Sequence, residues 1–364
     1  MAGSTYGNIF KITTWGESHG KGIGVVIDGC PAGLELSEED IQIYLNRRKP
    51  GQSKYSTPRK EDDAVEILSG VFEGKTTGTP ISLVVFNKNQ QSRDYSEIAS
   101  YYRPGHADYT FDEKYGFRDY RGGGRSSGRE TIGRVAAGAV AAKLLGQLGI
   151  TFTTYSKSIG PVEIQSFDAA QIMENPLYMP DANAAAKAAG FLEECMKNQD
   201  SAGGIIECII DGVPAGIGDP VFEKLDANLA KAMMSIGAVK GFEIGDGFAA
   251  ASSKGSTNND GFSMNDGMVK KVTNHSGGVL GGMSDGSSIV FRTAIKPTPS
   301  IAAMQNTINK SGEEIEISIK GRHDPIIVPR AVVVVEAMAA LTILDALLLN
   351  MTAKVDNIYN FYKK

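Results

Sequence analysis

An almost continuous apolar stretch near the end of the chain, residues 331–349 (AVVVVEAMAALTILDALLL), limits the possible folds most strongly. Its length suits either a membrane-spanning helix or a helix that is surrounded by protein on most sides. Glu336 and Asp345 interrupt the stretch, and a carboxylate at the depth of a bilayer is costly. Pro329, close to its start, is typical of the first turn of a helix. We therefore predict a buried central helix and no membrane span.

The rest of the chain alternates strand-like and helix-like patterns with glycine-rich loops, which predicts an α+β protein. No short repeat of the solenoid kind is evident, and the order of the elements indicates two related halves with helices packed between sheets. Strands are expected over 22–29, 65–72, 81–86, 151–164, 203–211, 288–295 and 315–319, and a turn leads into another within 235–247. Helices are expected over 37–48, 131–149, 181–198 and 219–234, and from 355 onward. Residues 252–266 and 275–286 have the composition of loops.

Composition and charge exclude several classes of function. With 364 residues, of which 41% are hydrophobic and 22% charged, the chain can bury a large core. Its net charge of -5 argues against a general nucleic-acid or anionic-membrane surface, so basic clusters are expected to be local sites. The three cysteines are far apart and lack metal-ligand spacing, which favours a reducing, cytoplasmic setting and no metal site. No Walker A, Rossmann, Gly-x-Ser-x-Gly or His-Glu-x-x-His motif is present.

The segment 119–130 (DYRGGGRSSGRE), directly before an Ala/Leu/Val-rich helical pattern, has the residue types of an anion site. Glycines can bring backbone N–H groups close to a ligand, serines can cap the helix or bind phosphate oxygens, and the helix dipole adds positive character. A glycine run alone is a weak motif and is equally typical of a flexible, solvated loop. Other segments with similar chemistry favour the anion site.

Three of the four histidines, His19, His106 and His323, lie in polar, glycine-rich or charged segments rather than on apolar faces. Such positions leave an imidazole able to point into a site. The basic, glycine- and proline-containing stretch 47–61 has the composition of a mobile lid over an anionic ligand, although charge runs are more often solvated. In the KPTPS segment (296–300), Lys296 and the two hydroxyls that follow it are suited to binding a phosphate.

Five segments taken together resemble the chorismate synthase family: GESHG (16–20), RPGHADYT (103–110), RDYRGGGRSS (118–127), KPTPS (296–300) and GRHDP (321–325). The resemblance extends over essentially the whole chain in the same order. It implies a carbon–oxygen lyase that converts 5-enolpyruvylshikimate 3-phosphate to chorismate and phosphate, the last step of the shikimate pathway. This anti-1,4-elimination requires reduced FMN, although no net redox change occurs. The resemblance also implies a β-α-β sandwich, with central helices between two antiparallel sheets, assembled as a homotetramer.

The resemblance assigns roles to individual residues. His19 would protonate or hydrogen-bond reduced flavin near N1 and the C2 carbonyl, His106 would protonate the departing phosphate, and Asp324, near flavin N5, would assist removal of the C6 proton. The substrate's anionic groups would be bound by Arg48 and Lys54, with Arg103, Arg121 and Arg129 as further candidates. The flavin would be contacted by Arg125, Ser126, Ser127, Gly237, Ala238, Gly281, Lys296, Pro297, Thr298, Pro299, Ser300 and Arg322.

Two positions depart from the family pattern. Lys54 stands where many members have arginine, which keeps the charge but loses the planar fork, and Gly128 replaces an alanine that is common after the paired serines. Family members either reduce their own flavin with NADPH or depend on an outside reductant. Because no extra nucleotide domain or long insertion is evident, we expect dependence on externally reduced FMN. We expect one domain over 1–364, with mobile loops near 47–61, 87–125, 252–270 and 320–326.

Two other functions remain open from the sequence. An NAD(P)H-dependent FMN oxidoreductase would also use basic, glycine-rich loops. A nucleic-acid-binding module would use the arginines of 118–134, but only Tyr120 is interleaved with them as a stacking aromatic. The expected partners are therefore the small-molecule substrate and a flavin reductant, with neither nucleic acid nor membrane.

Overall fold

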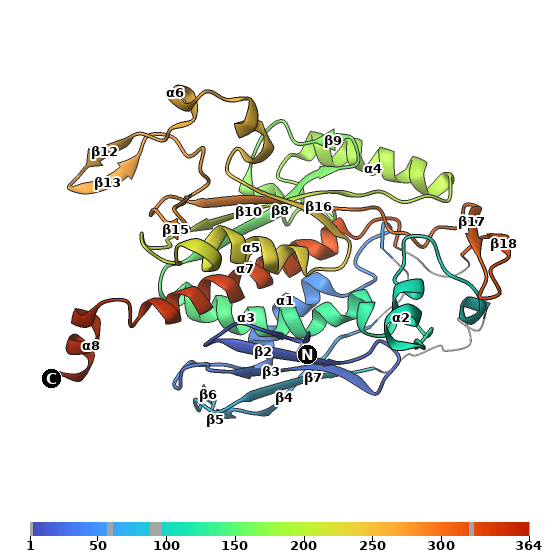
Figure 1. Cartoon of the computed structure of the whole chain (residues 1–364), viewed down its shortest axis with the longest axis horizontal. Coiled ribbons are helices and arrows are strands. Elements are labelled where there is room, and N and C mark those ends of the chain that lie inside the picture. Colours follow the sequence, from blue (N-terminus) through green and yellow to red (C-terminus); the bar gives the residue numbers. More distant parts are fainter. Residues whose placement is uncertain (1–2, 57–60, 88–96, 320–323, 364) are drawn as a thin grey trace.

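The computed structural model of the chain describes residues 3–56, 61–87, 97–319 and 324–363. Two five-stranded sheets enclose a layer of helices, as Figure 1 shows, and every strand pairing within them is antiparallel. The predicted α+β class and β-α-β sandwich are thus confirmed.

The first sheet is built from the N-terminal part of the chain. In spatial order its strands are β1 (Thr5–Tyr6), β2 (Lys11–Gly16), β3 (Gly22–Asp28), β7 (Ile81–Phe86) and β4 (Val65–Ser69). The strand predicted over 65–72 divides at Gly70, whose left-handed backbone (φ 84) turns the chain away. The residues beyond it form a separate small hairpin of β5 (Val71–Phe72) and β6 (Lys75–Thr76).

The second sheet comes from the C-terminal half. In spatial order its strands are β11 (Val239–Ile244), β16 (Ile289–Ile295), β10 (Gly204–Asp211), β8 (Thr151–Ile159) and β9 (Val162–Glu163). The single strand predicted over 151–164 is wrong, because Gly160 takes φ 51 and the chain folds back so that β9 pairs with the end of β8. β16 alternates buried and half-buried residues, so its sequence period of two is retained in the structure.

Four helices fill the space between the sheets. They are α1 (Glu38–Arg48), α3 (Thr131–Gln147), α5 (Leu225–Met234) and α7 (Val328–Asn350). Small side chains let α3 and α7 approach closely: a Cβ at Gly138 would lie 2.3 Å from the Cβ of Ala337. α7 is long and apolar enough to cross a membrane, but 78% of its most apolar window is buried against α3, α5, β8 and β10. The predicted buried central helix is therefore confirmed.

The two acids within α7 are buried, and each has hydrogen-bond partners. Glu336 accepts two hydrogen bonds from the Arg47 guanidinium, at 2.9 and 2.7 Å. Asp345 accepts from the backbone N–H groups of residues 8–10 at 2.7 to 3.1 Å and so fixes the turn before β2. Because a buried charge without partners is costly, these contacts explain how the apolar helix tolerates both carboxylates.

The remaining elements lie around this sandwich. Helices at its edges are α2 (Asp108–Tyr115), α4 (Ala182–Lys197), α6 (Gly255–Asn258) and α8 (Val355–Tyr362). Small hairpins pair β12 (Phe262–Asn265) with β13 (Met268–Lys271), β14 (Val279–Leu280) with β15 (Met283–Ser284), and β17 (Gln305–Ile308) with β18 (Glu314–Ile317). The prediction of loops throughout 252–266 and 275–286 is therefore wrong in part.

The helix predicted from Asp219 begins later, at Leu225. Val221 has φ 65, which lies outside the helical region, and Lys224 has an extended backbone, so neither residue can continue a helix from Pro220. By contrast, the helix predicted from Asp181 forms as α4, and Asp181 caps it by accepting from the N–H groups of Asn183 and Ala184 at 3.0 Å each.

Candidate active site

The glycine-rich loop 119–130 lies against the loop that carries His19, between β2 and β3. Gly122 has a left-handed backbone (φ 63), and a Cβ there would lie 2.4 Å from two atoms of the His19 ring. The Ser18 hydroxyl donates to the Gly122 carbonyl oxygen (3.2 Å) and lies 3.1 Å from His19 Nδ1. The His19 side chain is buried. The 119–130 loop and the His19 loop, which are distant in sequence, thus pack against each other.

Arg125 and the paired serines, Ser126 and Ser127, add further contacts in this region. The Arg125 guanidinium donates to the carbonyl oxygen of Gly16 (3.0 Å) and to the hydroxyl of Thr14 (2.6 Å). Ser126 donates its hydroxyl hydrogen back into its own turn, and the hydroxyl of Ser127 accepts from a backbone N–H and so caps the short 3-10 turn that precedes α3. The paired serines therefore shape the turn ahead of the helix, and Ser127 caps this turn rather than α3 itself, which begins at Thr131.

Arg129 connects the His19 loop to a second cluster of charges. Its guanidinium donates to the Asn87 side-chain oxygen (2.8 Å), and the Asn87 amide donates to two carbonyl oxygens of the 16–20 loop at 3.0 and 2.9 Å. Arg129 also forms an ion pair with Asp63 (3.2 Å), which accepts a 2.6 Å hydrogen bond from Arg48. The Arg48 and Asp63 side chains are almost completely buried.

Asp324 belongs to the same charged cluster. Arg330, in the first turn of α7, donates to Asp324 (2.6 Å) and to the backbone oxygen of Arg48 (3.0 Å). Burial lowers the pKa of Arg330, an effect that the Asp324 charge opposes. The chain next to Asp324 is anchored in turn, because the Pro325 oxygen accepts from the N–H of Ala202 at 2.9 Å.

His106 lies beside the 296–300 segment. Its Nε2 is 2.8 Å from the Ser300 hydroxyl, and Lys296 donates from Nζ to the Gly105 oxygen at 2.7 Å. A Cβ at Gly105 would lie 2.8 Å from Pro299, so the two segments touch. Burial lowers the pKa of Lys296, and the charge of Lys240 lowers it further.

The 296–300 segment is also joined to the residues around Asp324 and to the turn before β11. Ser201 donates its hydroxyl hydrogen to the Thr298 oxygen (2.7 Å). The next residue, Ala202, is the one whose N–H donates to the Pro325 oxygen. The backbone N–H of Lys296 donates to the oxygen of Ala238 (2.9 Å), which follows Gly237 and has a left-handed backbone (φ 72). Direct contacts and chain neighbours therefore connect His106, Asp324 and His19 through one network of loops.

Two of the arginines expected to bind substrate have acidic partners in their own segments. Arg103 donates to both oxygens of Asp108 at 2.7 Å each, and this pair is buried. Arg121 is exposed and donates to both oxygens of Asp119 at 2.8 Å. Arg322, expected to contact flavin, lies outside the described residues.

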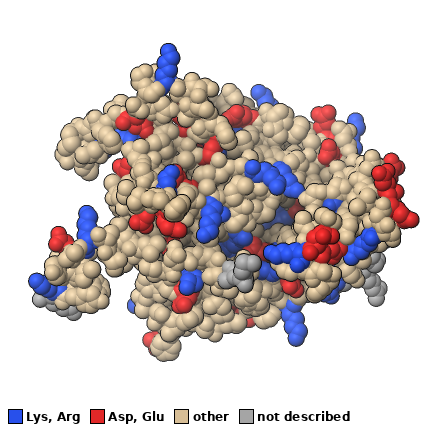
Figure 2. Space-filling view, viewed as in Figure 1, with Lys and Arg blue, Asp and Glu red and all other residues tan. Residues whose placement is uncertain are grey.

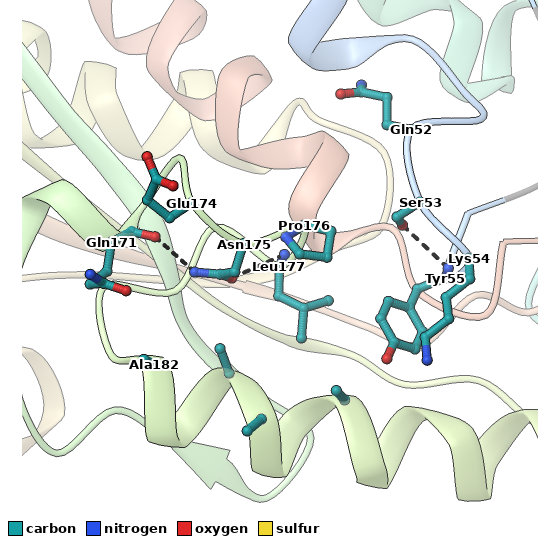
Figure 3. Close-up of a pocket in the computed structure, with 13 residues that line it drawn as sticks. Gln52, Ser53, Lys54, Tyr55, Gln171, Glu174, Asn175, Pro176, Leu177 and Ala182 are labelled. Carbon is teal, nitrogen blue, oxygen red and sulfur yellow. Dashed lines mark hydrogen bonds between the residues drawn. The ribbon is translucent and has the colours of Figure 1, made fainter.

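Lys54 lines a cavity that His19, His106 and Asp324 do not line. This cavity, of about 550 Å³, lies between residues 52–55, residues 171–177 and the alanine-rich face of α4 (Figure 3). Lys54 forms a 2.6 Å ion pair with Glu193, and both side chains are mostly exposed. A second cavity shares Tyr55 with the first and reaches Arg330, so this loop does border the Asp324 segment.

Gly281 is also separate from the network. It forms the turn of the β14–β15 hairpin with φ 61, and the next residue accepts a hydrogen bond from the N–H of Leu225 at the start of α5. Among the contacts of the described residues, none joins Gly281 to the loops around His106 or His19.

Three residues of the network did not emerge from the sequence: Asp63, Asn87 and Arg330. Asp63 follows a basic stretch in which the sequence analysis singled out the cations, and Asn87 directly follows the ordinary strand β7. Arg330 follows Pro329 at a helix start, which is a usual place for site residues and was the one available signal.

The charge distribution on the surface agrees with local anion sites. Figure 2 shows basic and acidic side chains side by side on the face that it presents, rather than one continuous basic area. On this face there is no broad cationic surface of the kind that binds a nucleic-acid backbone.

The family model described as chorismate synthase matches residues 10–348. The chain belongs to the chorismate synthase family. It is 76% identical to a chorismate synthase of Agathobacter rectalis, with 100% of each chain covered, and 55% identical to one of Methanosarcina mazei, with 96% of this chain and 97% of the relative covered. A solved structure titled as a crystal structure of chorismate synthase is similar with a TM-score of 0.78 and 32% identity, covering 98% of this chain and 97% of the other.

The chain is therefore a lyase of the shikimate pathway, as the sequence motifs predicted. The family match supports chorismate synthesis over the NAD(P)H-dependent oxidoreductase. Chorismate synthases form a family that needs reduced flavin and acts on a small molecule, and the polar loops described above are the candidate place for both.

Proposed function

We propose that this chain eliminates phosphate from 5-enolpyruvylshikimate 3-phosphate to give chorismate in the network of loops around His19, His106 and Asp324. The observation that carries the proposal is the set of contacts that links these residues, which are widely separated in sequence. The substrate has one phosphate and two carboxylates. Arg48 and Arg129 are suited to them because guanidinium groups can bind oxyanions with two parallel hydrogen bonds.

The residues of the 296–300 segment fit a bound FMN. The Thr298 hydroxyl is buried and has no hydrogen-bond partner among the described residues. Lys296 is half-buried, which lowers its pKa, and it donates to a neutral carbonyl oxygen, so an anion beside it would stabilise its charge. Ser126, Arg125 and this segment would hold the flavin. When bound, the reduced flavin supplies an electron-rich ring that assists cleavage of the carbon–oxygen bond.

His106 would give its proton to the departing phosphate. The adjacent anionic phosphate would favour the protonated imidazole, and Ser300 orients the ring through its contact with Nε2. Asp324 would assist removal of the C6 proton, held in place by Arg330. His19, held between Ser18 and Gly122, would donate a hydrogen bond or proton to the flavin.

The wider setting is part of the proposal. We infer that the flavin arrives reduced by an external reductant rather than by NADPH bound to this chain, and that the enzyme works in the cytoplasm. A homotetramer is supported by apolar side chains exposed on projecting elements, namely Phe262 and Met264 on β12 and Phe361 on α8. The chain would act as one domain, with the described parts of the loops near 47–61, 87–125, 252–270 and 320–326 moving as ligands bind; residues 57–60, 88–96 and 320–323 of these loops lie outside the described residues.

The role of His106 is tested by phosphate release from 5-enolpyruvylshikimate 3-phosphate with dithionite-reduced FMN, comparing the parent chain with His106→Ala. We expect activity in the parent and a loss of roughly a hundredfold or more in the variant, the range for removal of a general acid. His275→Ala is the matched control, because His275 pairs with Asp246 at the base of the β12–β13 hairpin. Equal turnover of the parent and His106→Ala would remove His106 from its role.

A further inference from the structure

We propose that Asp63 is a positioning residue for substrate binding: its carboxylate holds Arg48 and Arg129 in the arrangement that meets the anionic groups of the substrate. The inference rests on the proposed function, in which both arginines bind substrate. Asp63 itself would not touch the substrate, because its side chain is 0% exposed.

The geometry around Asp63 is that of a bridge. One carboxylate oxygen, Oδ2, accepts from Arg48 at 2.6 Å, and the other, Oδ1, is 3.2 Å from a terminal nitrogen of Arg129. The Asp63 side chain is 0% exposed, and those of the two arginines are 2% and 12% exposed. Oδ2 therefore fixes the Arg48 guanidinium by a hydrogen bond, and Oδ1 pairs with that of Arg129 through charge alone. Water is largely excluded from this place, where charge interactions are strong.

Three separate parts of the fold meet at this carboxylate. Arg48 ends α1, Arg129 lies in the turn before α3, and Asp63 precedes β4. Arg330, whose Nε donates to the backbone oxygen of Arg48, adds a third cation to the same region. Because like charges repel each other, Arg48 and Arg129 need a shared anion to remain close together before substrate arrives.

Glu61 also contacts Arg129, but it does not replace Asp63 in this role. Glu61 forms an ion pair with Arg129, whereas Asp63 pairs with Arg129 and Arg48 together. Glu61 is also more exposed, with 17% of its side chain accessible. Within the part of the chain that the structure describes, Asp63 is the acid that links the two cations.

The backbone of Asp63 makes a clean substitution possible. Asp63 has φ 47, in the left-handed region that asparagine and aspartate tolerate best after glycine. Asp63→Asn therefore keeps shape and backbone while removing the negative charge. The charge change alone would make the region more positive and would tighten binding of a substrate with three anionic groups, whereas lost positioning would weaken it. The two effects have opposite signs.

The test is steady-state phosphate release at saturating reduced FMN, with KM and kcat measured separately. We expect Asp63→Asn to raise KM for the substrate about tenfold while kcat changes by less than about threefold, the pattern of lost substrate binding. The matched control is Asp260→Asn, which removes another buried, ion-paired carboxylate, here with Lys271 at 3.0 Å, and should leave KM unchanged.

A double variant separates positioning from general destabilisation. If Asp63 acts through Arg129, then Arg129→Gln raises KM, and adding Asp63→Asn to it produces much less than the product of the two single effects. Circular dichroism of each variant checks that it is folded.

The outcomes distinguish the inference from the proposed function. An unchanged or lowered KM in Asp63→Asn, with a raised KM in Arg129→Gln, would overturn the positioning role and leave the proposed site in place. Fully multiplicative effects in the double variant would also overturn it. If the parent chain is active and neither Arg129→Gln nor Arg48→Ala changes KM, the assignment of the arginines to substrate binding is wrong, and the inference fails with it.

Discussion

At the scale of single residues, the space beside the His19 ring is defined by the absence of a side chain at Gly122. A Cβ at this position would lie 2.4 Å from His19 Cε1 and Nδ1 and 2.7 Å from the Ser18 hydroxyl oxygen. Its backbone is left-handed, at φ 63, which glycine adopts without steric cost. The glycine therefore serves two purposes, a tight turn and direct contact with a candidate catalytic ring.

Gly122→Ala should reduce turnover about tenfold or more, because the new methyl group displaces His19 and misplacement of a site residue is costly. Gly124→Ala is the matched control: Gly124 also has a left-handed backbone (φ 53), but a Cβ there would meet nothing within 4 Å. The measurements are turnover and thermal midpoint. Similar losses of turnover in both variants would mean that backbone strain, rather than contact with His19, is responsible.

At the scale of elements, the loop that carries His106 is held at its ends by ion pairs around α2. Asp108, the first residue of α2, accepts from the Arg103 backbone N–H (3.1 Å) and from its guanidinium. Arg118 closes the other side by donating to Asp112 and to two carbonyl oxygens near residue 100. The His106 backbone N–H donates to the Arg103 oxygen (3.2 Å), so these ion pairs also fix His106.

This arrangement predicts a pH-dependent contribution to stability. Burial alone would raise the pKa of Asp108, but the hydrogen bonds and charge of Arg103 hold it below its ordinary value of 3.8. A carboxyl group with a lowered folded-state pKa stabilises the protein above the unfolded value and loses this effect as pH falls through the folded value. The contribution should therefore be complete at neutral pH and be lost progressively as pH falls below about 3.8.

Asp108→Asn should lower stability by about 3 kcal/mol at pH 7, the typical cost of removing one partner of a buried pair. The difference from the parent should shrink as pH falls from 4 toward 3. Thermal midpoints across this range measure it, and Glu314→Gln, at an exposed position, is the control. A difference that is as large at pH 3 as at pH 7 would show that the charge of Asp108 is not its source.

At the scale of the whole molecule, the sandwich brings segments of both halves to one place. The His19 and 119–130 loops adjoin the first sheet, the 296–300 segment leaves the second, and Asp324 precedes the central helix. α7 contributes to both tasks, because its buried length forms the core and its first turn supplies Arg330. The most apolar part of the chain thus places charged groups in the candidate site.

The sequence predicted the elements that carry a strong apolar period and missed those that do not. α7, α3 and β16 follow from their patterns, and the family motifs indicated His19, His106 and Asp324. The β12–β13 hairpin was missed because the stretch 252–266 is polar as a whole; β12 alternates apolar and polar residues (FSMN), but all four are exposed, so its alternation marks no buried face. Asp63 could not be found either, since its role depends on two arginines brought together only by the fold.

The central claim is that these converging loops carry out a phosphate elimination with no net redox change. The most direct measurement is an anaerobic assay of the parent chain with 5-enolpyruvylshikimate 3-phosphate and dithionite-reduced FMN, without pyridine nucleotide, following phosphate and flavin absorbance together. We predict many equivalents of phosphate per flavin while the flavin ends reduced. Phosphate released only in step with flavin oxidation, or none from a folded chain, would contradict the account.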